Sequence, residues 1–276
     1  MLNDPPSQTP RPPRKDAAPK SEQPRQQVML HIPAVKPYAT YVLVGVYVLL
    51  FVAALASPTI LQNNSVELPD VLMYGQYHRL ATSLFLHSNL VHLLVVLFIL
   101  YTFGAWQERI FGHLRFVAIY LLGGLTGMVL AALLLALTRD MVTAVVGSSS
   151  AVGAMLGAEV SYLYQHRRLL GEKGRHRRNR VLMFSVINLL VGILYSAGDT
   201  AALPTTLAAW SPIGGVIGGA VLGWYLAPFF NLTKHPDHPE AIRAEDINPL
   251  NRRTTFVLIY ISVLLALLIV ATLLVR

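Results

Sequence analysis

The chain has 276 residues, of which 54% are hydrophobic and only 13% are charged, and its mean hydropathy is +0.52. Soluble domains carry roughly 25% charged residues, so this composition excludes an ordinary soluble protein and predicts a polytopic membrane protein. The chain has no cysteine, which excludes disulfides, thiolate nucleophiles and cysteine metal sites.

Residues 1–36 differ in composition from everything that follows. Eight prolines are mixed there with Arg, Lys, Gln and Ser, and large apolar residues are few. Such a segment cannot bury enough apolar surface to fold, so it is predicted to be a disordered, basic tail.

From Pro37 onward, long uncharged runs alternate with short polar joints. A helix of roughly 20 residues crosses the hydrocarbon core of a bilayer. Seven runs qualify: 39–56, 81–105, 114–137, 144–164, 181–198, 205–227 and 254–275. The predicted organisation is a six-span membrane domain over 37–230, a cytoplasmic linker over 231–253 and an additional span over 254–276.

The basic residues predict the orientation of these spans. If the N-terminus is cytoplasmic, nineteen of the 22 Lys and Arg residues lie on the cytoplasmic side, which fixes the N-terminus inside and the C-terminus outside. The net charge of +8 therefore reflects topology, and the basic cluster at 167–180 is a topology determinant that is also suited to anionic lipid. Because no aromatic residues are interleaved with that cluster, no nucleic-acid partner is predicted.

The stretch 147–158 combines small residues and hydroxyls inside an apolar sequence. Ser149, Gly153 and Gly157 fall on one face of a helix, and small residues at this spacing allow two membrane helices to approach closely. A serine on such a face is more often a packing residue than a nucleophile. A second face of this kind, Gly215, Gly219 and Gly223, predicts that the fourth and sixth spans touch.

Two histidines, His87 and His92, lie in the second span at a depth similar to that of Ser149. Polar groups there are costly and usually face the protein interior or a water-filled cavity. Each histidine taken alone is more often bonded to loop carbonyls than catalytic. Their spacing of five residues, without a cysteine or nearby carboxylate, implies no metal and no cofactor.

Together these residues resemble the rhomboid family of intramembrane serine proteases over roughly 70–230. The stretch from Gly75 to His87 is similar to the family's entry to the second span, with its arginine at Arg79. Gly147-Ser148-Ser149-Ser150 resembles the family's G-x-S-G motif, which places the nucleophile at Ser149, although Ser150 stands where a second glycine is usual. The resemblance implies a helical bundle of six core spans plus a seventh. It also implies that Arg79, His87, Gly147, Gly214 and Gly215 form the scaffold around a substrate site.

The sequence departs from the family at two polar positions. The family's sixth-span pattern Ala-His-x-Gly-Gly matches Ser211 to Gly215, so Pro212 stands where the general base is expected, and no histidine occurs from 177 to 234. The asparagine that helps to bind the oxyanion matches Val96. Pro212 inside a span also removes a backbone hydrogen bond, which allows a kink. In similar proteins, substrates use a crevice between the second and fifth spans.

A serine hydroxyl is a weak nucleophile without an adjacent base, and losing the base costs on the order of 10⁴- to 10⁶-fold in turnover. The favoured hypothesis is therefore a pseudoprotease that binds transmembrane helices of client proteins without cutting them. The alternative is an active serine endopeptidase with Ser149 as nucleophile and His92 as substitute base. A transporter is disfavoured, because the chain has no repeated halves and Glu159, its one clearly embedded carboxylate, has no evident partner in the sequence. A bacterial plasma membrane is the expected location.

Overall fold

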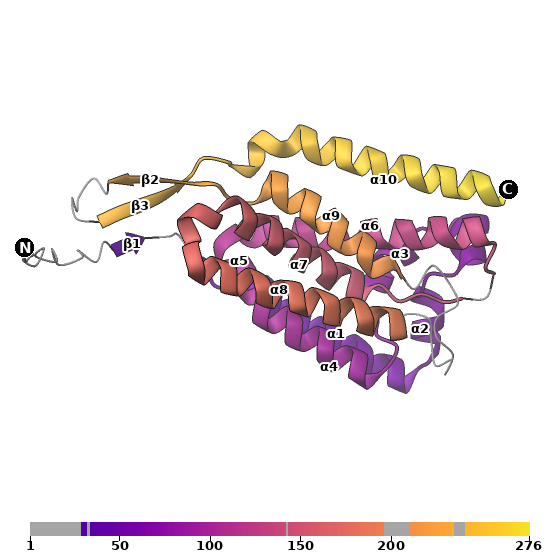
Figure 1. Cartoon of the computed structure of the whole chain (residues 1–276). Coiled ribbons are helices and arrows are strands. Elements are labelled where there is room, and N and C mark those ends of the chain that lie inside the picture. The colour runs from indigo at the N-terminus through magenta and orange to yellow at the C-terminus, as the bar shows by residue number, and fades with distance from the viewer. Residues whose placement is uncertain (1–28, 32–33, 142, 196–209, 235–240) are drawn as a thin grey trace, which may run out of the picture.

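The structure is a computed structural model, and it describes residues 29–31, 34–141, 143–195, 210–234 and 241–276. The chain forms an antiparallel bundle of long helices, with a small β-sheet at one end (Figure 1). We call this end the sheet end. The long helices are α1 (Tyr38–Ala56), α4 (Leu90–Ile99), α6 (His113–Thr138), α7 (Ser148–Gln165), α8 (Arg167–Tyr195), α9 (Ser211–Leu226) and α10 (Thr254–Val275).

Four helical stretches of the described chain are long and apolar enough to cross a membrane: Tyr38–Ala56, Leu90–Phe111, His113–Thr138 and Leu250–Val275. The other three long helices, α7, α8 and α9, are less typical of membrane spans, each for a different reason. Helix α7 contains many small and hydroxyl residues, α8 begins with the basic cluster, and α9 has 16 residues. The predicted all-α membrane bundle is confirmed.

Helix α7 is the centre of the bundle, and all residues from Ser148 to Glu159 are buried. Its neighbour α9 contacts it backbone to backbone. A Cβ added to Gly219 would lie 1.9 Å from the carbonyl oxygen of Ala154, and one added to Gly157 would lie 2.1 Å from that of Val216. The predicted contact between the fourth and sixth spans is confirmed, and it depends on glycine because no side chain fits between the two backbones.

The second span begins later than the predicted 81–105. Residues 79–85 form the short helix α3 (Arg79–Thr82) and the 3₁₀ turn η2 (Ser83–Phe85), and the long helix begins only at Leu90. Asn89 fixes this start, because its backbone is extended and its side-chain oxygen accepts a hydrogen bond from the backbone N–H of His92 at 2.9 Å. The helix continues through the π-helical turn η3 (Leu100–Gly104) and α5 (Ala105–Phe111).

Two further boundaries differ from the sequence-based prediction. Helix α8 starts at Arg167, so the basic cluster is helical, with a break at Gly171, whose φ is +50°. Helix α9 starts at Ser211, which puts Pro212 in its first turn. Proline there removes no intrahelical hydrogen bond, so Pro212 does not interrupt the helix as it would within a span. Residues 205–209 of the predicted sixth span lie outside the described residues.

The sheet end holds three strands, where no strand is predicted from the sequence. β1 (Met29–His31) pairs in parallel with β3 (Ala241–Asp246), which pairs antiparallel with β2 (Phe230–Lys234). The sheet thus pairs residues of the predicted tail with residues of the predicted linker. Residues 1–28 of that tail lie outside the described residues.

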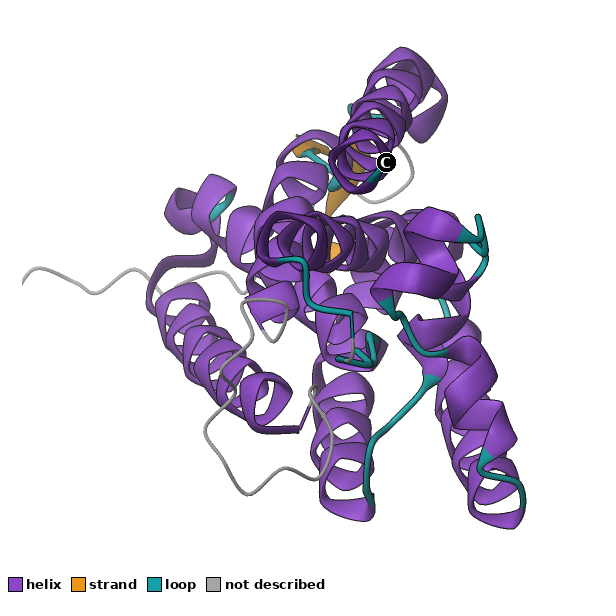
Figure 2. Cartoon of the chain, turned by 90° about the vertical axis from the view of Figure 1, so that its right-hand side faces the viewer, coloured by secondary structure: helices purple, strands orange, loops and turns teal. Residues whose placement is uncertain are grey.

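Helix α10 lies at the periphery of the bundle (Figures 1 and 2). Its contacts are mainly with α6, where Tyr260 and Thr126 share a hydroxyl–hydroxyl hydrogen bond of 2.6 Å. Near its end, the hydroxyl groups of Thr272 and Tyr77 lie 3.4 Å apart. The smaller elements α2 (Thr59–Asn64) and the π-helical turn η1 (Pro69–Met73) lie in the segment between α1 and α3, and the 3₁₀ turn η5 (Leu250–Arg253) precedes α10.

Candidate functional site

The first turns of α4 and α7 meet at the end of the bundle opposite the sheet. His92, in the first turn of α4, is fully buried. Its ring nitrogen Nδ1 lies 3.2 Å from Ser88 Oγ, and its Nε2 lies 3.5 Å from Ser148 Oγ. The second distance is at the outer limit of a hydrogen bond. The structure therefore brings the predicted histidine to the serine-rich start of α7, with the hydroxyl of Ser148 beside its Nε2.

Ser149, the predicted nucleophile, is fully buried in the first turn of α7. Its Oγ has no hydrogen-bond partner among the described residues, and its carbonyl oxygen accepts a hydrogen bond of 2.8 Å from Asn188 Nδ2 of α8. Sequence reasoning missed Asn188. A polar residue in the middle of an apolar run was the available signal, since such residues usually face a polar partner inside the bundle.

Pro212, where the resemblance predicts the general base, presents backbone rather than a side chain that accepts protons. Pro212 packs at the start of α9, and its carbonyl oxygen would lie 3.1 Å from a Cβ added to Gly153. The α9 surface that faces α7 is formed by glycines together with Val216 and Ala220, and Ser211–Leu226 contains no histidine, carboxylate or amine. The helix that carries the base in the resemblance therefore offers no base here.

The position where the resemblance predicts an oxyanion donor is also apolar. Val96 lies one turn after His92 on α4 and is fully buried. A valine side chain has no N–H or O–H to donate, so it cannot stabilise a developing negative charge.

His87 lies in the connection before α4 and is 4% exposed. Its ring packs edge-on against Tyr47 at 4.4 Å between centroids, and against His92 at 5.4 Å. Tyr47, in turn, pairs its hydroxyl with that of Tyr120. His87 therefore joins His92 to an aromatic cluster formed by α1 and α6.

Arg79 organises the segment before α3. Its Nη1 donates to the carbonyl oxygen of Gln62 at 2.7 Å and lies 3.0 Å from an Asp70 carboxylate oxygen, and its Nε donates to Gln76 at 2.7 Å. Because Arg79 is 6% exposed, these bonds hold the loop against the bundle rather than presenting a charge to a ligand.

Two of the three predicted scaffold glycines explain how the helices come together. The N–H of Gly147 donates to the carbonyl oxygen of Ser83 at 2.9 Å, which ties α7 to the turn before α4. A Cβ on Gly215 would lie 2.1 Å from the carbonyl oxygen of Ser150. The third, Gly214, lies against Gly127 of α6, where an added Cβ would be 2.9 Å from the Cα atom.

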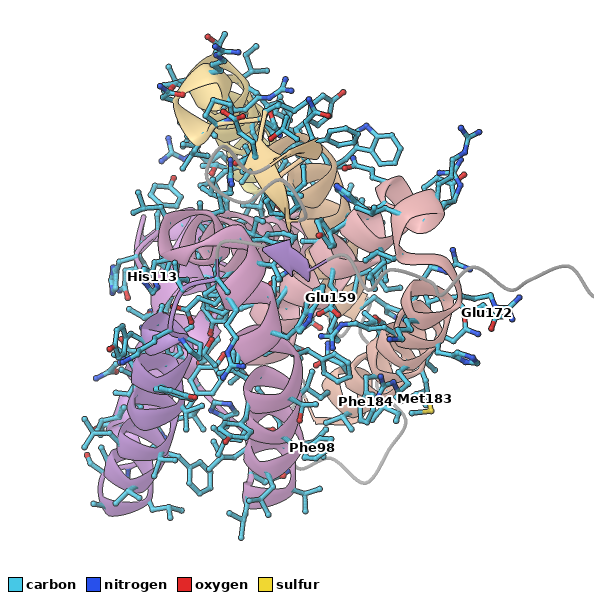
Figure 3. The ribbon with its side chains drawn as sticks, turned by 90° about the vertical axis from the view of Figure 1, so that its left-hand side faces the viewer. Phe98, His113, Glu159, Glu172, Met183 and Phe184 are labelled. Carbon is cyan, nitrogen blue, oxygen red and sulfur yellow. The ribbon has the colours of Figure 1, made fainter. Side chains whose placement is uncertain are left out.

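The embedded carboxylate Glu159 has a partner, which corrects the prediction from sequence. Arg177 of α8 donates from Nε to Glu159 at 2.6 Å, and its guanidinium carbon lies 3.7 Å from the ring centroid of Trp106. Glu159 lies in the interior of the bundle, whereas Glu172 is at its edge (Figure 3). The ion pair links α7 to α8, and the antiparallel turn between these helices brings together residues 18 apart in sequence.

Phenylalanines join the second and fifth spans at the predicted entry crevice. Phe184 of α8 lies 5.6 Å from Phe98 of α4 and 5.0 Å from Phe103, measured between ring centroids (Figure 3). Phe98 is 55% exposed on the outer surface of the bundle. In this conformation the two helices are in aromatic contact.

The comparisons with known proteins identify the family of the chain. The family model described as a rhomboid domain matches residues 74–229. Inactive rhomboid protein 1 of Drosophila melanogaster is 28% identical over 172 residues, which cover 62% of this chain and 11% of that protein. RHOMBOID-like protein 6, mitochondrial, of Arabidopsis thaliana is 29% identical over 171 residues (62% and 50%).

Rhomboid protease GluP of Bacillus subtilis is 25% identical over 205 residues, which cover 72% of this chain and 36% of that protein. The chain thus spans half or less of the length of these relatives, and their names include both an inactive protein and a protease. The matched domain contains the serine-rich start of α7, both histidines and the glycine-lined α9. The chain is an integral membrane protein that belongs to the rhomboid family.

Proposed function

We propose that this protein is a rhomboid pseudoprotease that binds transmembrane helices of client proteins and does not cleave them. The observation that carries the proposal is the composition of α9 beside Ser149. Pro212 occupies the base position, and α9 contains no group that accepts a proton at neutral pH. Val96 leaves the oxyanion position without a donor.

The chemistry of acyl transfer explains why these two changes matter together. The serine must lose its proton as it attacks, and the resulting oxyanion must be stabilised by donors already in place. Removal of the base costs on the order of 10⁴- to 10⁶-fold in turnover, and removal of one oxyanion donor costs roughly 10²-fold, although such effects are not additive. The unpartnered Oγ of Ser149 is consistent with an unactivated hydroxyl.

The scaffold that would receive a client helix is still present. Helices α4 and α8 meet through side chains such as Phe98 and Phe184, and no backbone hydrogen bond joins the two helices among the described residues. A client helix that entered there would replace aromatic contacts with similar apolar contacts. We therefore place client binding at this crevice, with lipid around it and no cofactor.

One observation favours the second candidate, an active intramembrane endopeptidase. His92 Nε2 lies 3.5 Å from Ser148 Oγ, and Ser149 is the adjacent residue. A small shift of α4 would let His92 act as the base for Ser148, and a rotation at the start of α7 would be needed to present Ser149 instead. This candidate predicts that His92→Ala abolishes cleavage.

The two candidates differ in the reactivity of the serine. We expect no labelling of the purified full-length protein by a fluorophosphonate probe, which acylates only activated serines. Ser149→Ala and Ser148→Ala are the matched controls, and an active rhomboid protease is the positive control. Labelling that disappears in either serine variant would refute the pseudoprotease and identify the nucleophile.

Client binding needs its own test, because absence of cleavage does not show it. A photo-crosslinking residue at Phe98 is expected to capture membrane-protein helices in native membranes. The same residue at Leu49, which is 69% exposed on α1, is the control. Equal capture at both positions would show contact with bulk membrane proteins only and would refute a specific binding crevice.

A further inference from the structure

A cavity of about 520 Å³ opens at the sheet end, where three helix ends meet. Its walls come from the end of α7, the end of α9, and the segment that leads into α10. The lining residues include Gln165, Arg167, Trp224, Phe229, Asn248 and Arg253. A neighbouring cavity of about 490 Å³ shares Gln165, Arg167 and Phe229, and adds Arg168.

Two guanidinium groups face this cavity without a carboxylate partner. Neither Arg167 nor Arg253 takes part in any ion pair among the described parts of the chain. Asp246, an acidic group of the same segment, is paired with Arg115, whose Nη2 lies 2.7 Å from its carboxylate. The cavity therefore presents two uncompensated positive charges, which favour an anion.

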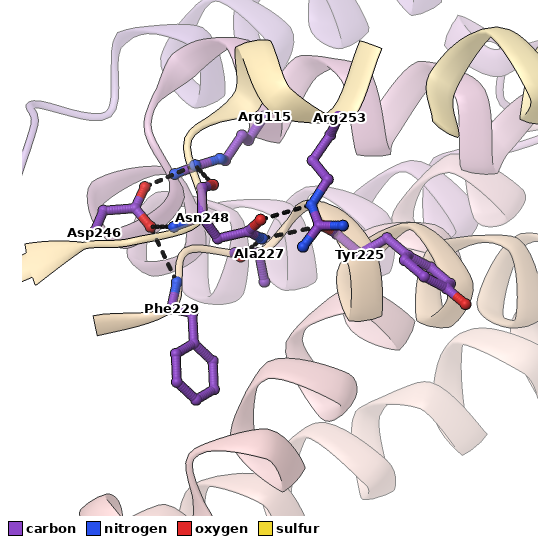
Figure 4. Close-up of polar contacts among 7 residues, drawn as sticks. All are labelled: Arg115, Tyr225, Ala227, Phe229, Asp246, Asn248 and Arg253. Atoms are coloured by element: carbon purple, nitrogen blue, oxygen red, sulfur yellow. Dashed lines mark hydrogen bonds and ion pairs between the residues drawn. The ribbon is translucent and has the colours of Figure 1, made fainter. Parts of the chain in front are cut away.

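The protein holds these arginines in place through neutral groups. Asn248 donates from Nδ2 to the carbonyl oxygens of Tyr225 and Ala227, at 3.0 and 2.8 Å, and its Oδ1 accepts from Arg253 Nε at 2.6 Å (Figure 4). This arrangement uses the Nε atom and leaves the Nη atoms of Arg253 without an acceptor among the described residues. Arg167 is held over the Tyr164 ring, with 4.4 Å between its guanidinium carbon and the ring centroid.

The opposite wall is aromatic and apolar. Trp224 is 49% exposed, Phe229 is 45% exposed and Ile247 is 51% exposed. Tryptophan is enriched at the membrane–water interface, and α9 ends two residues after Trp224. The cavity thus combines a cationic part with an apolar part at the height where a membrane span ends, which is the division of polarity found in a phospholipid.

From this geometry we propose that the cavity binds the phosphate of an anionic phospholipid headgroup. Arg167 and Arg253 hold the phosphate oxygens, and the upper acyl chain lies along Trp224 and Phe229. Arginine suits this role because its planar fork binds phosphate through two hydrogen bonds. Basic pockets between membrane helices are known binding sites for anionic headgroups.

The test is a native mass spectrometry titration of the full-length protein with phosphatidylglycerol and with phosphatidylcholine of the same acyl chains. We expect the protein to retain phosphatidylglycerol more tightly than phosphatidylcholine. We expect Arg167→Gln/Arg253→Gln to weaken the binding of phosphatidylglycerol by about tenfold or more, which corresponds to the loss of one or two charge-assisted hydrogen bonds. The matched control is Lys173→Gln/Arg175→Gln, which removes the same charge from exposed positions of α8 outside the cavity.

Equal affinity of the two double variants would overturn the proposal, because attraction to the total charge would then explain the binding. Displacement of the lipid by millimolar glycerol phosphate would also overturn it, since the site would then hold a soluble phosphate. If the glutamine variant fails to fold, Trp224→Ala makes the same comparison through the apolar wall. Unchanged retention of phosphatidylglycerol in that variant would refute the lipid assignment.

Discussion

The contact between α7 and α9 makes Gly219→Ala a sharp test of the packing. The added Cβ would lie 1.9 Å from the carbonyl oxygen of Ala154 and 2.4 Å from its carbonyl carbon. Ordinary contacts of a Cβ atom begin near 3.4 Å. Both groups are backbone, so no side-chain rotation relieves the clash, and the two helices must move apart by about 1 Å or more.

Two effects of opposite sign determine the outcome. Alanine has a better helix propensity than glycine by about 0.5–1 kcal/mol, whereas overpacking of a tight core costs typically 1–3 kcal/mol. The clash is with backbone, and Gly215 and Gly223 make similarly close backbone contacts along the same helix. We therefore expect a destabilisation at the upper end of that range. At about 2–4 °C per kcal/mol, Tm should fall by several degrees.

The control is Gly45→Ala on α1, where an added Cβ meets nothing within 4 Å. We expect this variant to keep or slightly raise Tm, because only the helix propensity changes. Both variants are measured by thermal unfolding in the same detergent. A Tm for Gly219→Ala that is equal to or above that of Gly45→Ala would refute the backbone contact between α7 and α9.

Three further predictions concern the polar contacts. Arg177→Gln should destabilise the fold by about 3–5 kcal/mol, because it leaves Glu159 buried and unpaired. The double variant Glu159→Gln/Arg177→Gln should recover much of the lost Tm, and a double variant without that recovery would count against the ion pair. Tyr260→Phe should cost about 0.5–1.5 kcal/mol by removing the hydroxyl contact with Thr126, and a matched loss in Thr126→Val that is not additive would verify the pair. Burial lowers the pKa of His166, which follows α7. The unfolded chain therefore takes up the proton first, so Tm should decline as pH falls below about 6.5, and His166→Gln should flatten this decline.

The sequence predicts the fold better than it predicts the site. Long uncharged runs identify the spans, because a bilayer leaves few alternatives to a helix of the right length. Glycines at a spacing of four predict the contact of α7 with α9, because that periodicity places them on one face. These patterns are local, so one sequence is enough to read them.

The details of the site depend on single residues and on contacts between distant segments, which the periodicity of a sequence run does not encode. The start of α4 at Leu90 follows from the cap at Asn89, a single residue inside an apolar stretch. The hydroxyl beside His92 Nε2 is that of Ser148 rather than that of the motif serine, because one residue of rotation at the start of α7 decides which hydroxyl faces α4. The roles of Ser149 and His92 in function stay predictions.

Helix α8 is fastened to α7 at two heights, by Arg177 to Glu159 and by Asn188 to the carbonyl oxygen of Ser149. The two points are eleven residues apart, or roughly 16 Å along a helix. Moving α8 away as a rigid rod breaks both polar contacts. Tilting it about the ion pair breaks only one of them, the Asn188 hydrogen bond, worth about 1 kcal/mol, together with the ring contacts of Phe184. We therefore expect α8 to tilt about its ion pair with Glu159, and Asn188 is the polar contact that holds the other part of the helix beside the serines.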